Sequence, residues 1–289
     1  MSALRDTGWA KLNLTLEVLG RRADGFHEIR SLVAFVRLGD EIALEPGEGL
    51  ELEIAGPFAE VLGGDNLITK AARLASARVP GLRLGRFRLR KLLPVAAGLG
   101  GGSADAAAAL RLIARAHAGS LKETMLAGLA REIGSDVSVC LASRPALIAG
   151  RGEHVVPVGR FPSCGALLAN PRLPLATEAV YAALGVGSVA PSKNRDSETP
   201  DFAGELAPLL AYTVPRSNEL ETPATRLVPE IRDVLAALRG LDGVRLARMS
   251  GSGPTCFALF ATEDEARRAQ TALAARHPNW WIAATSLRD

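Results

Sequence analysis

The sequence predicts an α+β protein with two domains. Segments with the two-residue period of strands and segments with the 3.6-residue period of helices both occur. They do not alternate regularly, as they do in a doubly wound α/β protein. The length of 289 residues accommodates one large or two medium domains, at roughly 100–200 residues per domain. We place the boundary near residues 158–162, which gives domains at 1–158 and 159–289.

The first half contains most of the predicted strands. At residues 10–18 apolar and polar residues alternate strictly, which predicts a half-buried strand. Its polar face carries Lys11, Asn13, Thr15 and Glu17. Further strands are predicted at 29–36, 41–44, 50–54, 82–89, 146–148 and 154–158. Helices are predicted at 67–77, with Asp65 or Asn66 as N-cap, at 103–117, with Gly119 as C-cap, and at 121–133.

The second half begins with a segment that lacks periodicity. Residues 187–203 are rich in Ser, Pro and charge, which predicts a surface loop or a disordered excursion. After this segment, helices are predicted at 202–210, 230–238 and 263–275, and strands at 244–249, 256–260 and 281–286.

Composition and charge exclude several classes of protein. With 48% hydrophobic and 22% charged residues the chain is globular rather than disordered or collagen-like. The net charge of +3 is only mildly basic. The densest basic stretch, free of acidic residues, contains Arg73, Arg78, Arg83, Arg86, Arg88, Arg90 and Lys91. It is open to three interpretations: a solvated face, a positive rim for an anionic substrate, or a nucleic-acid contact. We favour the solvated face.

The cysteines and the apolar segments predict a cytoplasmic protein. Cys140, Cys164 and Cys256 lie far apart and lack metal-site spacing, which favours buried reduced thiols. The first residues lack the apolar core of a signal peptide. No apolar run reaches the ~20 residues that a membrane-spanning helix needs.

A glycine-rich loop is the most informative motif. It comprises Pro94, Val95, Ala96, Ala97, Gly98, Leu99, Gly100, Gly101, Gly102, Ser103 and Ala104. Glycines let the backbone approach a ligand and turn its N–H groups toward it, and the start of the following helix adds positive potential. No Gly-Lys-Ser/Thr follows, so this is not a Walker A loop, and the spacing does not fit a dinucleotide fingerprint. The loop therefore predicts phosphate binding.

Three polar residues suit phosphoryl transfer, which depends on positioning and charge neutralisation. Lys11 can stabilise the transferred phosphate or polarise an acceptor hydroxyl, and Asn13 can orient that hydroxyl. Asp136 follows the helix that ends before Gly134, and it can accept the hydroxyl proton or pair with Lys11. From the residues alone, a strand lysine that reaches solvent and a helix-capping aspartate stay open as alternatives.

At this point the chain resembles the GHMP kinases. Their signature is a proline followed by Gly-Leu-Gly and a small-residue helix start, as at residues 94–104. The triple glycine at 100–102 is similar to the diphosphocytidyl-methylerythritol kinases in particular. Further resemblance lies at residues 10–16, in the Asp24-Gly25-Phe26-His27 loop and at residues 249–257, with weaker echoes at 133–137 and 149–153.

The resemblance implies an N-terminal domain of the ribosomal S5 domain 2-like type, a C-terminal ferredoxin-like domain, and Lys11 and Asp136 as catalytic residues. Phe26 and His27 would recognise cytosine, with Tyr181 on the other face of the base. Phe26 replaces the family's usual Tyr. The cofactors implied are ATP and Mg²⁺, with Mg²⁺ bound mainly through ATP phosphates and no dedicated protein metal site.

The function implied is phosphorylation of the 2-hydroxyl of 4-diphosphocytidyl-2-C-methyl-D-erythritol in non-mevalonate isoprenoid biosynthesis. The expected partner is this small molecule, with no nucleic acid or membrane, and the protein is expected to be a monomer or homodimer. Two alternatives stay open: a GHMP kinase for homoserine or mevalonate, and a nucleotide-binding sensor without catalysis. The base-recognition loop argues against the first, and the presence of Lys11, Asn13 and Asp136 argues against the second.

Overall fold

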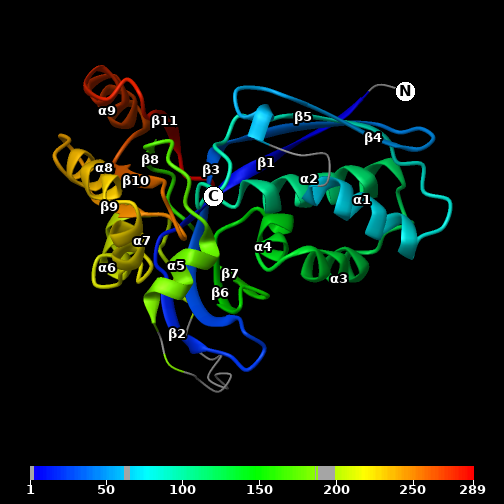
Figure 1. The fold of residues 1–289 in the computed structure, drawn as a ribbon, viewed down its shortest axis with the longest axis horizontal. Helices are drawn as coiled ribbons and strands as arrows, with labels where there is room; N and C mark the ends of the chain where they lie inside the picture. The colour runs from blue at the N-terminus through cyan, green and yellow to red at the C-terminus, as the bar shows by residue number, and fades with distance from the viewer. Residues whose placement is uncertain (1–2, 62–65, 186, 188–198) are drawn as a thin grey trace. The chain divides into compact units, whose positions relative to one another are not determined.

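The computed structural model describes residues 3–61, 66–185, 187 and 199–289 (Figure 1). Residues 188–198, in the middle of the predicted Ser- and Pro-rich loop, lie outside this range. The α+β class is confirmed. The chain forms two compact units, and each is assembled from segments that are distant in sequence. The first unit comprises Met1–Ala10, Leu38–Val95 and Gly100–Ser143, and the second comprises Lys11–Arg37, Ala96–Leu99 and Arg144–Asp289. The domain boundary near residue 158 stays a prediction.

Four strands contribute to the sheet of the first unit. They are β1 (Leu4–Asn13), β3 (His27–Glu45), β4 (Leu50–Ala55) and β5 (Gly85–Arg90), of which β1 and β3 give residues to both units. β5 runs parallel to β4 and antiparallel to β3, and β1 also pairs with β3. Along β5, Phe87 pairs with Leu44 and Leu89 with Ile42. These four side chains are buried and form the apolar side of the sheet.

Helices cover that apolar side. They are α1 (Leu67–Arg78), α2 (Gly101–Ala116), α3 (Glu123–Ile133) and α4 (Val137–Ala142); the short 3-10 helix η1 (Ala59–Val61) precedes them. Figure 1 shows α1 to α4 on one side of these strands, and α2 packs against both α1 and α4. Asn66 begins α1 with a capping box, because its side chain accepts from the Thr69 N–H while Thr69 bonds back to Asn66. The predicted C-cap of α2 was wrong: the helix ends at Ala116 with His117 as its cap, before Gly119 is reached.

In the second unit, three further strands extend the pairing around the first part of β3. They are β2 (Glu17–Arg21), β6 (Ala146–Gly150) and β7 (His154–Pro157). β2 and β6 each pair antiparallel with β3, and β7 pairs with β6. The continuous strand predicted at residues 10–18 was wrong. β1 stops at Asn13, since the Leu16 N–H bonds the Ser217 carbonyl rather than a neighbouring strand.

The rest of the second unit is a four-stranded antiparallel sheet. Its strands are β8 (Gly165–Asn170), β9 (Leu246–Met249), β10 (Cys256–Phe260) and β11 (Trp281–Ser286), in the order β11-β8-β10-β9. The helices are α5 (Thr177–Leu184), α6 (Leu206–Thr213), α7 (Glu221–Leu227), α8 (Glu230–Arg239) and α9 (Glu263–Arg276). α8 and α9 pack on the sheet (Figure 1). This strand order and the β-α-β-β-α-β sequence make the unit ferredoxin-like, as expected.

Candidate active site

In the first unit, the glycine loop leads into an open helix start. Gly100 is the N-cap of α2 and adopts φ 64°, the left-handed region that a side chain disfavours. Having no side chain, it leaves the first N–H groups of α2 without a side-chain cap. Gly102 is exposed and Ser103 is half-buried, so these N–H groups and the Ser103 hydroxyl can be reached from outside the unit. The arrangement suits an anion such as a phosphate.

Asp136 lies elsewhere in the same unit. It is the N-cap residue of α4, preceded by Gly134 as the C-cap of α3. Its backbone carbonyl accepts from the Cys140 N–H at 3.1 Å, but its carboxylate makes no capping hydrogen bond to α4. The simple capping role considered from the sequence therefore does not account for this side chain.

In the second unit, Lys11 and Asn13 form a buried polar group at the end of β1. They are 4% and 2% exposed, so the polar side of this strand does not face solvent. The Lys11 Nζ donates to Asn13 Oδ1 at 3.1 Å, and Asn13 Nδ2 donates to Ser31 Oγ at 2.8 Å. The Lys11 backbone N–H also donates to the Leu99 carbonyl at 2.8 Å. Lys11 is thus fixed against the glycine-loop residue Leu99 rather than extended into water.

The second glycine loop, residues 249–256, contacts both the end of β1 and the first glycine loop. The Ser250 hydroxyl accepts from the Asn13 N–H at 3.2 Å and donates to the Gly98 carbonyl at 2.9 Å. Asn218 also supports this loop, because its side-chain amide donates to the carbonyls of Met249 and Gly251, each at 2.8 Å. This loop therefore closes on the glycine-loop residues Ala97 and Gly98.

The residues predicted to bind a base lie in the second unit, and two of them contact each other there. The rings of His27 and Tyr181 stack with centroids 4.6 Å apart and planes at 24°. Phe26 is 48% exposed, and the Arg151 guanidinium lies 4.8 Å from its ring centroid. Burial lowers the pKa of His27, with a further lowering by Arg21, which favours the neutral form of the ring. A neutral imidazole has one donor and one acceptor nitrogen, which suits the edge of a base.

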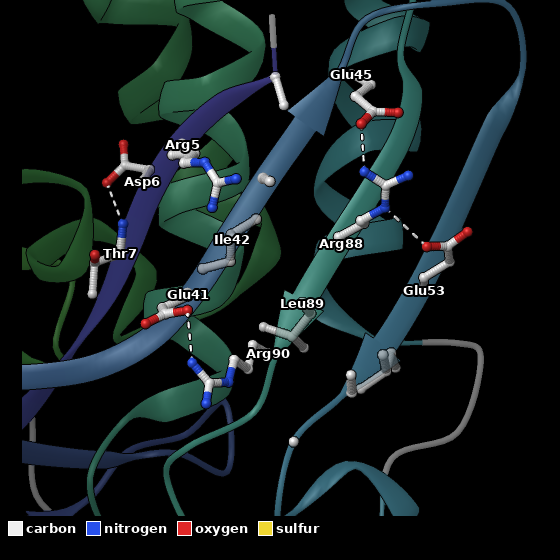
Figure 2. A pocket seen from close by; sticks show the side chains of 15 residues that line it. Arg5, Asp6, Thr7, Glu41, Ile42, Glu45, Glu53, Arg88, Leu89 and Arg90 are labelled. Atoms are coloured by element: carbon white, nitrogen blue, oxygen red, sulfur yellow. Dashed lines mark hydrogen bonds and ion pairs between the residues drawn. The ribbon is translucent and has the colours of Figure 1, made fainter.

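A large hollow in the first unit is not this site. It measures about 920 Å³ and lies on the face of the sheet opposite the helices (Figure 2). Figure 2 shows its charges paired with one another: Arg88 with Glu45 and Glu53, and Arg90 with Glu41. Neither the glycine loop nor Lys11 or Asp136 lines it. Part of the basic stretch of residues 73–91 is thus a charge-balanced solvated face.

Two family models match the chain. The model of the GHMP kinases N terminal domain matches residues 66–144, and that of the GHMP kinases C terminal matches residues 202–279. The chain belongs to the GHMP kinase family. The kinase is 50% identical to the 4-diphosphocytidyl-2-C-methyl-D-erythritol kinase of Rhodopseudomonas palustris over 98% of this chain and 97% of that protein. A relative of the same name from Bradyrhizobium diazoefficiens is 47% identical over 99% of each chain.

Solved structures support the same assignment. A crystal structure of 4-(cytidine 5'-diphospho)-2C-methyl-D-erythritol kinase matches with a TM-score of 0.78 and 36% identity, covering 99% of this chain and 100% of the other. The homoserine kinase of Cytophaga hutchinsonii matches with a TM-score of 0.71 over 99% of this chain and 95% of the other. At 18% identity, this second likeness shows the shared fold alone. The kinase is an ATP-dependent enzyme that acts on a small molecule.

Sequence reasoning missed several supporting residues of the site. Ser31, Asn218 and Ser250 are buried polar side chains that hold Asn13 or the second glycine loop. Each is separated in sequence from what it holds, so no local spacing indicated it. The sequence offered one hint, because Ser250 lies within residues 249–257, a segment that already resembled the family.

Proposed function

We propose that the kinase transfers the γ-phosphate of ATP to the 2-hydroxyl of 4-diphosphocytidyl-2-C-methyl-D-erythritol, giving the 2-phosphate and ADP. The observation that carries this proposal is the near full-length similarity, at 44–50% identity, to relatives named as kinases of this compound. The stacked His27 and Tyr181 rings support it independently, since an acceptor with a cytosine base needs an aromatic site. The reaction belongs to non-mevalonate isoprenoid precursor biosynthesis.

The glycine loop is proposed to bind the phosphates of ATP. Residues 94–104 supply the backbone N–H groups at the uncapped start of α2, and the Ser103 hydroxyl adds a donor. These groups are oriented before ATP arrives, so they neutralise phosphate charge without reorganising. Mg²⁺ bound to ATP would neutralise the remaining charge between the phosphates. Among the described residues no group of three or more His, Cys, Asp or Glu side chains gathers as a metal site.

Lys11 and Asp136 are proposed to act on the reacting groups. Transfer breaks the acceptor O–H bond and the bond between the γ-phosphorus and the bridging oxygen of ADP, and it forms the new O–P bond. Asp136 takes the hydroxyl proton, and Lys11 stabilises negative charge on the transferred group. Asn13, which already holds the Lys11 ammonium, orients the acceptor hydroxyl.

Phe26, His27 and Tyr181 are proposed to bind the cytosine base. Phe26 is exposed and available for stacking, and the Tyr181 ring stacks on His27 beside it in the sequence. Stacking of one base on an aromatic ring contributes about 1–3 kcal/mol. Because Phe26 lacks the hydroxyl of the family's usual Tyr, its role is limited to stacking.

We also propose that the enzyme works in the cytoplasm. Cys140, Cys164 and Cys256 are all buried, as reduced thiols commonly are in proteins kept in a reducing compartment. Within the described residues, none of the helices has the length and apolar character needed to cross a membrane.

The test is ADP release from Mg-ATP with four acceptors offered separately: the cytidyl compound, methylerythritol phosphate, homoserine and mevalonate. Turnover with the cytidyl compound alone is expected. Turnover with homoserine or mevalonate instead would leave the family assignment in place and overturn the base-binding roles. ATP binding without turnover on any acceptor would favour a sensor. Asp136→Asn is expected to fold normally and to lose most of its turnover; near-normal turnover would remove Asp136 from the mechanism.

A further inference from the structure

Three charged side chains are buried together in the first unit. Asp40 of β3, Lys91 just after β5 and Asp105 of α2 have side chains that are 0%, 3% and 5% exposed. The Lys91 Nζ donates to Asp40 Oδ2 at 2.6 Å and to Asp105 Oδ2 at 2.7 Å. Burying a charge is costly unless it is paired. Two carboxyl groups share one ammonium group here, so the cluster would carry one uncompensated negative charge if all three were ionised.

The two carboxyl groups are not equivalent. The Oδ1 atom of Asp40 accepts from the backbone N–H groups of Leu92 and Leu93, at 2.6 and 2.9 Å. The Oδ1 atom of Asp105 is buried without a hydrogen-bond partner among the described residues. Three donors thus favour the ionised form of Asp40, and only the Lys91 Nζ favours that of Asp105. The extra proton of the cluster therefore belongs to Asp105.

The electrostatic surroundings also favour a proton on Asp105. Burial raises the pKa of Asp105 to about 8, with Lys91 opposing the rise and Asp40 adding to it. Lys91 and Asp40 are the charged groups that act on this carboxyl. On neighbouring elements, Lys70 of α1 donates to the Ile133 carbonyl, and Asp6 of β1 pairs with Arg111. On α3, Glu132 forms an exposed pair with Arg78.

The cluster lies directly behind the first turn of α2. A Cβ atom on Gly101, the first residue of the helix, would lie 3.2 Å from the Lys91 Nζ and 3.6 Å from Asp40 Oδ2. On the other side, a Cβ atom on Gly8 would lie 2.6 Å from Asp105 Oδ1. Asp40 also fixes the backbone of residues 92 and 93, immediately before Pro94. The cluster therefore links β3, the segment after β5 and α2 at the two ends of the glycine loop, and β1 packs closely against it at Gly8.

We propose that Asp40, Lys91 and Asp105 are positioning residues for the glycine loop, and that a proton held on Asp105 keeps the cluster neutral behind the phosphate-binding turn. This inference rests on the proposed role of the loop in binding ATP. The helix start attracts phosphate through its N–H groups and its positive potential. A net negative charge behind the same turn would oppose that attraction. Loss of the Asp105 proton is therefore expected to weaken ATP binding while the fold is retained.

The test compares the dissociation constant of ATP, measured by calorimetry from pH 7 to 9.5, in the wild-type enzyme and in Asp105→Asn. Asparagine keeps an oxygen for Lys91 and cannot ionise. In the wild type the constant is expected to rise about tenfold above pH 8, as for one partly shielded charge near the phosphates. In Asp105→Asn it is expected to match the wild type at pH 7 and to stay constant. The exposed Asp242→Asn is the control and should follow the wild type.

A second variant completes the test. Asp105→Ala removes the acceptor for Lys91, so its dissociation constant for ATP should be raised at every pH but should not rise further above pH 8. Identical pH profiles in the wild type and Asp105→Asn would overturn the inference, and so would an Asp105→Asn enzyme that binds ATP as tightly as the wild type at pH 9.5. If the wild type binds ATP with the expected profile but phosphorylates no acceptor, the inference stands and the proposed function fails. If the wild type binds no ATP at any pH, both fail.

Discussion

At the scale of single residues, the burial of Lys11 distinguishes it from an ordinary strand lysine. Its ammonium group is held by Asn13 within a network that includes Ser31. Lys11→Met keeps most of the side-chain volume and removes the charge. We expect kcat to fall by about 100- to 1000-fold, the usual cost of losing one preorganised charge-stabilising group. KM for ATP should change only a few-fold, because the glycine loop is intact.

The matching control for Lys11→Met is Lys122→Met, which changes an exposed lysine at the N-cap of α3. Steady-state kinetics and a thermal melt of both variants separate catalysis from folding. A Lys11→Met enzyme with kcat within threefold of the wild type would show that Lys11 has a structural role only.

The polar residues of the site could be predicted from the sequence only in part. Lys11 and Asn13 were recognised from their spacing, but the alternating pattern suggested a half-buried strand, and both are almost fully buried. Asp40 was not singled out, Lys91 was noted only as a member of the basic stretch of residues 73–91, and the link of both to Asp105 was not foreseen. The three residues come together only because β3, the end of β5 and α2 pack against one another. A periodic pattern within one segment of the sequence contains no information about such packing.

At the scale of elements, the Ser250 hydroxyl joins the second glycine loop to both Asn13 and Gly98. Ser250→Ala removes both the acceptor for the Asn13 N–H and the donor to the Gly98 carbonyl. Ser250 is fully buried, so these groups would be left without partners at a cost of about 1–3 kcal/mol in the free energy of unfolding. We also expect lower kcat, because Asn13 and the loop lose their common support.

A neighbouring serine provides the control. Ser252→Ala changes the same loop but removes only the contact between the Ser252 and Thr177 hydroxyls. Urea unfolding and kinetics should therefore show a smaller effect for Ser252→Ala than for Ser250→Ala. Equal effects would mean that the loop tolerates loss of the Ser250 bridge.

Replacement by alanine is expected to have opposite effects at Gly98, in the glycine loop, and at Gly128, in α3. Gly98 adopts φ 72°, and a Cβ atom there would lie 2.3 Å from the Ser250 carbonyl oxygen. Gly98→Ala is expected to destabilise the protein by more than about 2 kcal/mol and to abolish tight ATP binding. Gly128, inside α3, has open space around it, so Gly128→Ala should stabilise the helix by about 0.5–1 kcal/mol. A Gly98→Ala protein with normal stability would contradict the close approach of the two glycine loops.

The elements with a clear period were predicted well. β10 and β11 match their predicted bounds to the residue, and α9 extends one residue further than expected. β8 was missed, because its short apolar run is buried along its whole length and shows no alternation. The short helix α4 was missed because one and a half turns give too little pattern to detect.

At the scale of the whole molecule, the sequence indicated the fold class, and the ferredoxin-like unit followed from the family resemblance. The interleaving of the two units was not predicted. It arises because β1 and β3 are each shared, so segments on either side of Ala10 and Arg37 fall into different units. Patterns read in order along the chain predict domains that are contiguous in sequence. Units assembled from separate segments become visible only from the pairing of strands that are distant in sequence.

The buried cluster also makes a prediction about the stability of the whole molecule. The pKa of Asp105 is raised to about 8 in the folded state, whereas an unfolded aspartate titrates near about 3.9. Between these values the folded protein binds a proton that the unfolded chain releases. The contribution of Asp105 to stability is therefore fully present below about pH 4, declines as the pH rises, and levels off above about pH 8.

Asp105→Asn cannot lose a proton, so its free energy of unfolding should lack this decline. Urea unfolding of both proteins at intervals between pH 5 and 9 measures the difference. We expect Asp105→Asn to gain stability relative to the wild type as the pH rises to 8, by at most about 1.4 kcal/mol per pH unit, and the difference to be constant above that. A difference that does not change with pH would place the proton of the cluster elsewhere. The stability curve needs no ATP, so it tests the state of Asp105 separately from the role of the glycine loop.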